Sequence, residues 1–165
     1  GIQFPEVSVG STPTMCVAKN LSGVTEIRPG NYAIFDAFQA AIGSCSLDDV
    51  AISVLSTVIG AYENRLVLDC GALALSKDQG PVHVDPKCGF GRLFTENFVP
   101  LDGLSLIGLS QEHGKVVGPD VQQFQVGDRI RIVPNHSCLT LACFDTAQVI
   151  ERNKVVDTWS PCRGW

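Results

Sequence analysis

From about residue 51 onward, the chain carries short runs of valine, isoleucine and leucine separated at regular intervals by turn residues. Short strands at regular spacing, without long helical patterns between them, are typical of an antiparallel sandwich or barrel. We therefore predict a mainly β fold, with an antiparallel β-sandwich or barrel domain over residues 43–165. The expected strands are residues 52–59, 65–69, 104–109, 129–133 and 147–151, and the expected turns are Glu63-Asn64, Gly114-Lys115, Gly127-Asp128 and Asn153-Lys154.

The first 42 residues have a different pattern. A strand is expected on each side of a glycine-containing turn and a short connection, over residues 4–9 and 24–28. This order is what the last units of a parallel (β/α) barrel contain. Residues 36–42 have helical spacing, with Asp36 as the N-cap. The chain is therefore predicted to contain the C-terminal end of a (β/α) barrel, residues 1–42, followed by the antiparallel domain.

Charge, hydropathy and cysteine content restrict the classes of function. The formal net charge is −5 with both signs mixed along the chain, so no nucleic-acid partner is expected. No apolar run reaches the about 20 residues that a membrane span needs, so no membrane association is expected. The seven cysteines are odd in number and lack a C-x-x-C motif, which favours a reduced, cytoplasmic protein. The chain does not begin with methionine, so we expect it to be part of a longer protein.

One motif near the C-terminus, PNHSCLT at residues 134–140, carries two side chains that bind metals. It follows a run of valine and isoleucine, so we predict that it continues a strand. Residues i and i+2 of a strand point to one face, which would place the His136 imidazole beside the Cys138 thiol. Both are zinc ligands, and two protein ligands leave open positions, as a catalytic metal requires. The alternative is a buried cysteine with an incidental histidine, because H-x-C is a weak motif.

Further segments occur in a fixed order along the chain. They are GSTPT at 10–14, EIRPGNY at 26–32, LSQEHG at 109–114, the PNHSCLT motif, and DTW at 157–159. Together they resemble the D-serine dehydratase and D-threonine aldolase family, and the resemblance covers nearly the whole chain. It implies a pyridoxal-phosphate enzyme with a barrel of the alanine racemase type and a metal in its second domain.

The resemblance also implies roles for individual residues. His136 and Cys138 would bind zinc, and His113 would lie beside these ligands. The residues alone leave simpler alternatives open, because a Gly-Ser-Thr segment is most often only a turn and His113 is as readily a structural histidine. The cofactor phosphate would be bound by two N-terminal loops, through Ser11, Thr12, Gly30, Asn31 and Tyr32.

For the whole enzyme, the resemblance implies elimination of water from D-serine or a related 3-hydroxy-D-amino acid, with release of a 2-oxo acid and ammonia. Zinc would bind the departing hydroxyl group. The first alternative is a D-threonine or 3-hydroxy-D-aspartate aldolase; family aldolases tend to have a carboxylate in place of Cys138, which favours the dehydratase. The second alternative is a non-catalytic β domain that binds a metal or a partner.

A pyridoxal-phosphate enzyme needs a lysine that forms an imine with the cofactor. None of the lysines in this chain lies in a segment that resembles the family's cofactor lysine. We therefore expect the chain to be inactive alone and to need the remainder of the barrel. By the same resemblance, a second subunit is expected, in a homodimer. The five lysines are Lys19, Lys77, Lys87, Lys115 and Lys154.

Overall fold

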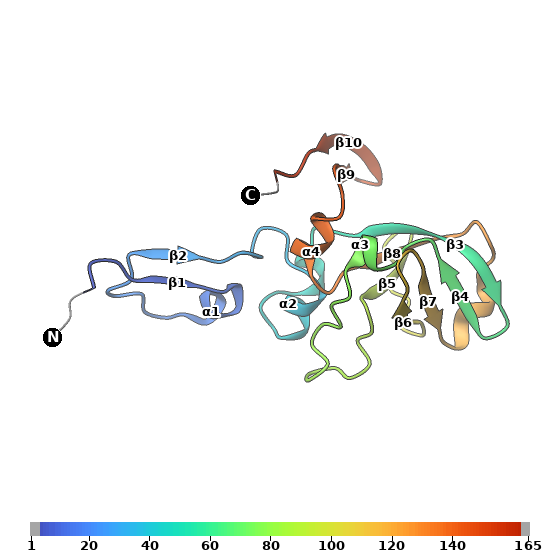
Figure 1. Cartoon of the computed structure of the whole chain (residues 1–165), viewed down its shortest axis with the longest axis horizontal. Coiled ribbons are helices and arrows are strands. Elements are labelled where there is room, and N and C mark those ends of the chain that lie inside the picture. The colour runs from blue at the N-terminus through green and yellow to red at the C-terminus, as the bar shows by residue number, and fades with distance from the viewer. Residues whose placement is uncertain (1–3, 163–165) are drawn as a thin grey trace.

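The computed structural model describes residues 4–162, so the first three residues of the predicted barrel portion lie outside it. Near the N-terminus, β1 (Ser8–Gly10) and β2 (Glu26–Arg28) pair in parallel, with α1 (Thr12–Val17) in the connection. This β–α–β unit projects from one end of the molecule (Figure 1). The parallel pairing confirms the expected barrel-type segment, although both strands are shorter than predicted.

The body of the molecule is a six-stranded antiparallel sheet with the strand order β5-β8-β3-β4-β7-β6. Its strands are β3 (Val54–Tyr62), β4 (Arg65–Leu68), β5 (Arg92–Thr95), β6 (Ser105–Leu109), β7 (Gly114–Val117) and β8 (Arg129–Val133). The sheet curls so that its two edges meet: the N–H of Phe90, just before β5, donates to the Leu106 carbonyl of β6 at 2.9 Å. The two edge strands thus approach each other, which confirms the predicted antiparallel β domain.

The main hydrophobic core lies on one face of this sheet. Successive side chains of a strand point to opposite faces, and buried residues alternate accordingly in β3 and β4, whereas β8 is buried on both faces from Ile130 to Val133. The short helix α3 (Ala72–Leu75) and the 3-10 helix η2 (Pro119–Gln123) add Leu75 and Val121. The fully buried members are Val58, Leu66, Leu68, Leu106, Val116, Ile130 and Ile132. All of them belong to the sheet, so its core does not depend on the N-terminal unit.

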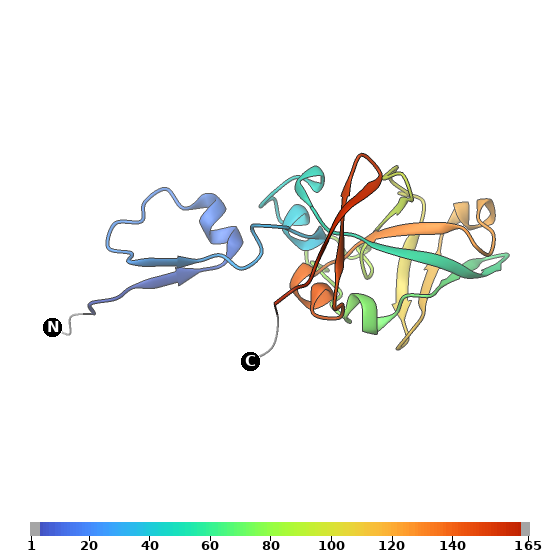
Figure 2. The same cartoon turned by 90° about the horizontal axis from the view of Figure 1, so that it is seen from above.

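Three short helices lie where the N-terminal unit meets the sheet. They are α2 (Ala37–Ala41), the 3-10 helix η1 (Leu47–Asp49) and α4 (Ser137–Leu141). Figures 1 and 2 both show α2 and α4 between the β–α–β unit and the sheet, although about a hundred residues separate them in sequence. The helix predicted over 36–42 is confirmed as α2, and Asp36 is its N-cap.

Two of the expected turns are displaced. Gly114 and Lys115 begin β7, and the turn consists of residues 110–113, because Leu109 pairs with Gly114. Gly114 meets a close backbone instead of forming a turn: a Cβ there would lie 2.8 Å from the Cys70 carbonyl oxygen. The last turn is centred one residue earlier than expected, on Arg152 and Asn153, which both have positive φ.

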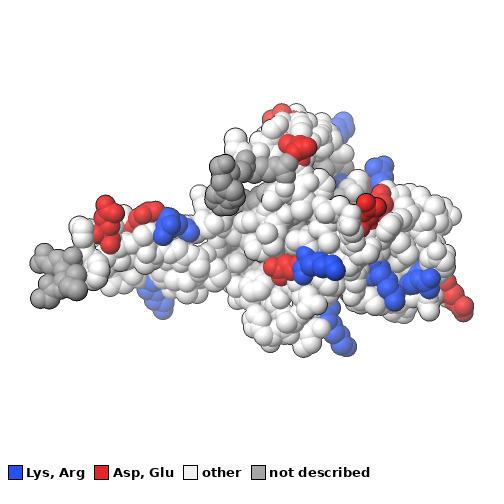
Figure 3. Space-filling model, viewed as in Figure 1, with Lys and Arg blue, Asp and Glu red and all other residues white. Residues whose placement is uncertain are grey.

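That last turn joins β9 (Ala147–Glu151) and β10 (Lys154–Trp159), which form a separate antiparallel hairpin. Figure 1 shows the hairpin standing away from the six-stranded sheet. On the face drawn in Figure 3, lysine and arginine are dispersed among aspartate and glutamate and do not form a band. Within residues 4–162, no helix has the length and apolar character needed to cross a membrane.

Candidate metal and cofactor site

The predicted metal ligands His136 and Cys138 lie at the start of α4, and the prediction that they lie on a strand is wrong. β8 ends at Val133. Pro134 follows and has no N–H to donate to a neighbouring strand. His136 is the N-cap of α4, with φ −138° and ψ 101°, and Cys138 lies in the first helical turn. A shared metal would therefore be held at a helix start and not on a strand face.

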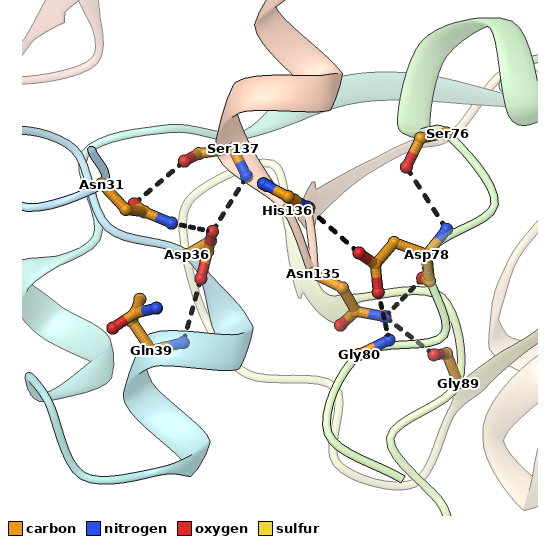
Figure 4. Close-up of polar contacts among 10 residues, drawn as sticks. All are labelled: Asn31, Asp36, Gln39, Ser76, Asp78, Gly80, Gly89, Asn135, His136 and Ser137. Atoms are coloured by element: carbon orange, nitrogen blue, oxygen red, sulfur yellow. Dashed lines mark hydrogen bonds and ion pairs between the residues drawn. The ribbon is translucent and has the colours of Figure 1, made fainter. Parts of the chain in front are cut away.

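A carboxylate from a distant loop holds the His136 imidazole. Nδ1 of His136 lies 3.1 Å from Oδ2 of Asp78, 58 residues earlier in the chain (Figure 4). A carboxylate only accepts hydrogen bonds, so Nδ1 carries the hydrogen and donates it. In the neutral ring, Nε2 then keeps its lone pair for a metal. The His136 side chain is 40% exposed, so a ligand can reach it.

Asp78 is itself fixed by its neighbours. The Gly80 N–H donates to Oδ1 of Asp78 at 2.7 Å. The buried Asn135 uses its amide nitrogen twice, donating to the carbonyls of Asp78 at 3.0 Å and of Gly89 at 2.9 Å. Gly80 has φ +67°, and a Cβ there would lie 2.7 Å from Cγ of Asn135, so only glycine fits. One carboxylate oxygen of Asp78 is thus used within the loop, and the other meets His136.

A second carboxylate, that of Asp36, holds the start of α4 through a backbone N–H group. Asp36 is 1% exposed. Its Oδ1 accepts from the Gln39 N–H at 2.9 Å, which caps α2. Its Oδ2 accepts from the Ser137 N–H, the first residue of α4, at 3.0 Å, and also from Nδ2 of Asn31. One buried side chain therefore supplies acceptors to the starts of two helices (Figure 4).

Asn31 connects this network to the predicted cofactor loops. Its Oδ1 accepts from the Ser137 hydroxyl at 3.0 Å, and its N–H donates to Oγ1 of Thr12 at 3.0 Å. Thr12 follows β1 and Asn31 lies beyond β2, so both loops extend from the carboxyl ends of two adjacent parallel strands. Ligands of α/β folds bind at this edge. The structure thus brings both loops together, beside the turn that carries His136.

The two loops have the donors that a phosphate group needs. The Ser11 hydroxyl is exposed and contacts Oγ1 of Thr14 at 2.8 Å. Tyr32 is exposed, and a Cβ at Gly30 would meet nothing within 4 Å, so the space beside these residues is open. The Asn31 amide already uses both its oxygen and its nitrogen within the protein. Ser11, Gly30 and Tyr32 thus leave room for a phosphate, whereas Thr12 is buried and, with Asn31, holds the loops together. The role of all five residues in binding the cofactor stays a prediction.

The donor set of the α4 turn fits a metal that keeps open positions. The Cys138 thiol is free and exposed, and an imidazole with a thiolate is a nitrogen and sulfur pair that suits zinc. Among residues 4–162, no group of three or more histidine, cysteine, aspartate or glutamate side chains could hold a metal. Within these residues, His136 and Cys138 alone are proposed to bind the metal.

His113, predicted to lie beside the metal ligands, occupies the turn between β6 and β7. It is hydrogen-bonded to Ser110, whose hydroxyl lies 3.5 Å from Nδ1 of His113. None of its described hydrogen bonds or ion pairs involves His136 or Cys138. The role of His113 stays a prediction.

The metal turn is the start of α4, which carries His136 and Cys138. Sequence reasoning missed the three residues that position it: Asp36 in its contact with α4, Asp78 and Asn135. The D-x-G pattern of residues 78–80 is a turn pattern, and it indicates a loop but not its partner. Asp36 is recognisable as a helix cap, although only for α2. The contacts with the α4 turn span 58 and 101 residues, and no local pattern indicates them.

The parallel β–α–β unit followed by an antiparallel domain defines part of an alanine racemase-like fold. Within that class the chain belongs to the serine dehydratase family, because the family model described as a putative serine dehydratase domain matches residues 51–150. It is 39% identical to the D-threo-3-hydroxyaspartate dehydratase of Delftia sp. (strain HT23), over all of this chain and 46% of that protein. It is 37% identical to the D-serine dehydratase of Dictyostelium discoideum, over all of this chain and 44% of that protein.

A D-threonine aldolase of Arthrobacter sp. is 30% identical, over 84% of this chain and 34% of that protein. Solved structures of a D-threo-3-hydroxyaspartate dehydratase superpose on 99% of this chain and on 44% and 46% of theirs, with TM-scores of 0.89 and 0.88 and 39% identity. One is a histidine-to-alanine mutant, and the other is a cysteine-to-alanine mutant in the metal-free form, substituted two positions further on. The chain spans less than half the length of the dehydratases that it matches.

Proposed function

We propose that this chain is the metal-carrying C-terminal part of a pyridoxal-phosphate- and zinc-dependent lyase. The whole enzyme eliminates water from D-serine or a related 3-hydroxy-D-amino acid and releases a 2-oxo acid and ammonia. The observation that carries the proposal is the hydrogen-bond network from Thr12 through Asn31 to Ser137. It ties loops that suit a cofactor phosphate to a turn that presents an imidazole and a thiol.

Each group of residues has its own task in this proposal. Nε2 of His136 and Sγ of Cys138 hold the zinc ion. A dehydratase relative for which alanine mutants at a histidine and at a cysteine two positions later have been solved, the latter metal-free, supports this pair. The phosphate is bound at the carboxyl ends of β1 and β2 by Ser11, Thr12, Gly30, Asn31 and Tyr32.

Bound in these loops, pyridoxal phosphate would supply an electron sink for the substrate Cα. Zinc on the α4 turn would supply a Lewis acid for the departing hydroxyl. The chain's own contribution is to hold the two binding elements in a fixed relation. Asp36 and Asn31 each contact both α4 and the N-terminal unit, and such positioning lowers the entropic cost of aligning the reacting groups.

The remainder of the barrel is proposed to supply the imine-forming lysine. All five lysines of this chain are exposed, and none belongs to the network around Asp36. The N-terminal unit also exposes large apolar side chains, with Phe4, Val17 and Ile27 between 49% and 74% exposed. Two parallel strands with such a surface are normally covered on both faces, which supports a barrel around them. A second subunit is proposed from the family resemblance alone.

Aldol cleavage is the second candidate, because the Arthrobacter aldolase is also a relative. The two reactions are distinguished by their products. The protein that contains this chain together with the rest of its barrel should release ammonia and a 2-oxo acid from D-serine or D-threo-3-hydroxyaspartate. Release of glycine and an aldehyde from a 3-hydroxy-D-amino acid would instead identify the aldolase.

The metal assignment is tested with the same protein. Zinc content by atomic emission should be near stoichiometric in the wild type and lost in His136→Ala and in Cys138→Ala. Cys143→Ala is the matched control, because Cys143 is also exposed and lies on the same segment. Zinc retained in both ligand variants would contradict the proposed site.

A further inference from the structure

We infer that Asp78 is the positioning residue for the metal ligand His136, holding the imidazole so that Nε2 faces the metal. The inference rests on the proposed metal site. It extends that site to a residue to which the family resemblance assigns no chemical role. It is carried by the contact between Oδ2 of Asp78 and Nδ1 of His136 at 3.1 Å. This geometry fixes both the tautomer and the ring orientation.

The contact lies in partly shielded surroundings. The Asp78 side chain is 31% exposed and that of His136 is 40% exposed. A hydrogen bond to a carboxylate is stronger than one between neutral groups, and a carboxylate on the far nitrogen also makes the coordinating nitrogen more basic. Asp78 therefore acts on the metal through His136, without touching the metal itself.

The surrounding loop holds Asp78 in place for this task. Its backbone carbonyl is tied to Asn135, the residue adjacent to His136, and its Oδ1 is occupied by the Gly80 N–H. The carboxylate therefore has one oxygen left to direct at the imidazole. Without that acceptor, the His136 ring is free to rotate and to place its hydrogen on Nε2, a form that cannot bind a metal through that nitrogen.

Asp78→Asn is the sharpest perturbation, because it keeps the shape of the side chain. An asparagine amide can donate to Nδ1 as well as accept from it, so it no longer selects the tautomer with a free Nε2. Loss of a partner beyond the metal ligands costs about 10–100-fold in metal affinity. We expect zinc to bind Asp78→Asn that much more weakly than the wild type.

Asp85 offers a matched control in the same loop. Its Oδ1 accepts from the N–H two residues later, that of Lys87, at 2.9 Å, just as Asp78 accepts from Gly80. Its other carboxylate oxygen lies 3.8 Å from an Arg92 nitrogen, and none of the hydrogen bonds or ion pairs found in residues 4–162 joins it to a histidine. Asp85→Asn thus weakens a loop contact of the same kind without reaching the metal turn, and its zinc affinity should equal that of the wild type.

The dissociation constant of zinc is measured on the protein with its full barrel, by competition with a chromophoric chelator. Cobalt is then substituted for zinc, and the thiolate-to-cobalt absorption band reports whether Cys138 still coordinates. The inference predicts weaker zinc binding in Asp78→Asn, an unchanged constant in Asp85→Asn, and a cobalt–thiolate band that persists at saturating metal. Gly80→Ala, which displaces the loop but keeps the carboxylate, should also weaken binding.

The possible outcomes separate this inference from the proposal beneath it. Equal zinc affinity in Asp78→Asn and the wild type, with zinc lost in His136→Ala, overturns the role of Asp78 and leaves the metal site standing. A wild type without zinc, or zinc retained in His136→Ala, overturns the metal site and the inference with it. If Asp78→Asn does not fold, the result in Gly80→Ala decides, because unchanged affinity there contradicts the positioning role.

Discussion

Replacing Asp36 with alanine should destabilise the junction between the N-terminal unit and the sheet. The carboxylate is buried and accepts hydrogen bonds from two backbone N–H groups, those of Gln39 and Ser137, and from the Asn31 amide. Alanine removes both acceptor oxygens, and with them all three hydrogen bonds, at once. The Ser137 N–H then has no acceptor, because Ser137 is itself completely buried.

The size of the loss follows from these contacts. Removing an N-cap side chain costs about 1 kcal/mol. A buried donor left without its charged acceptor costs about 1.5–3 kcal/mol, and the Asn31 amide, which is only half-buried, adds less because water can reach it. The expected loss in the free energy of unfolding is therefore about 3–5 kcal/mol, the sum of the cap, the unpaired Ser137 N–H and the smaller contribution of Asn31.

The assay combines urea unfolding with amide hydrogen exchange in the protein with its full barrel. Asp36→Ala should unfold at lower urea, and the N–H groups of Gln39 and Ser137 should exchange much faster while the strands of the sheet stay protected. Asp49→Ala is the control, since Asp49 caps η1 from an exposed position and its loss should have little effect. Unchanged protection of Ser137 in Asp36→Ala, or equal effects of both substitutions, would refute the reasoning.

Three further outcomes are expected. Zinc should protect Cys138 from iodoacetamide and leave the similarly exposed Cys143 modified, as peptide mass spectrometry would show; equal labelling of Cys138 with and without zinc would contradict the ligand assignment. Burial raises the pKa of the Cys70 thiol to about 11, so Cys70 should stay unlabelled in the native protein at neutral pH and react only after unfolding. For Asp69, burial opposes ionisation, but hydrogen bonds from a serine hydroxyl and a backbone N–H outweigh it and lower the pKa. This contribution to stability is present above the unfolded pKa of about 3.9 and is lost as the pH falls through the lower folded value. The difference in Tm between the wild type and Asp69→Asn should therefore shrink on acidification, and a constant difference would contradict the assignment.

Much of the sheet could be predicted from sequence, because burial on one face leaves a local pattern. The strand expected over 129–133 is found with the same bounds, and that expected over 52–59 is found shifted to Val54–Tyr62. β7 was missed because it begins with Gly114, which resembles a turn residue. Glycine is needed at position 114 because a Cβ there would clash with the carbonyl oxygen of Cys70, 44 positions earlier. A contact between residues so far apart in sequence leaves no local pattern.

The candidate site shows the same limit more sharply. The residue types and their spacing, together with the family resemblance, led to His136 and Cys138 as the predicted ligands, and their role stays a prediction. The backbone that carries them was not predictable, because Val133 ends the strand and Pro134 begins a turn whose shape depends on distant residues. The preceding valines and isoleucines favour continuation of the strand, and only the contacts with Asp36 and Asp78 show why a helix starts there instead.

These two carboxylates bear on the predicted boundary at residues 42 and 43. The sheet has its core within residues 58–132, so a fragment that begins at residue 43 should keep that core. The start of α4, however, takes its backbone acceptor from Asp36 and a hydroxyl partner from Asn31, which both lie before the boundary. A fragment cut there should retain Asp78 against His136 but lose the acceptor for the Ser137 N–H. Its six-stranded sheet should stay folded, but the start of α4 should become less ordered. A boundary at residues 42 and 43 leaves the hydrophobic core intact and separates Asp36 and Asn31 from the rest of the candidate site.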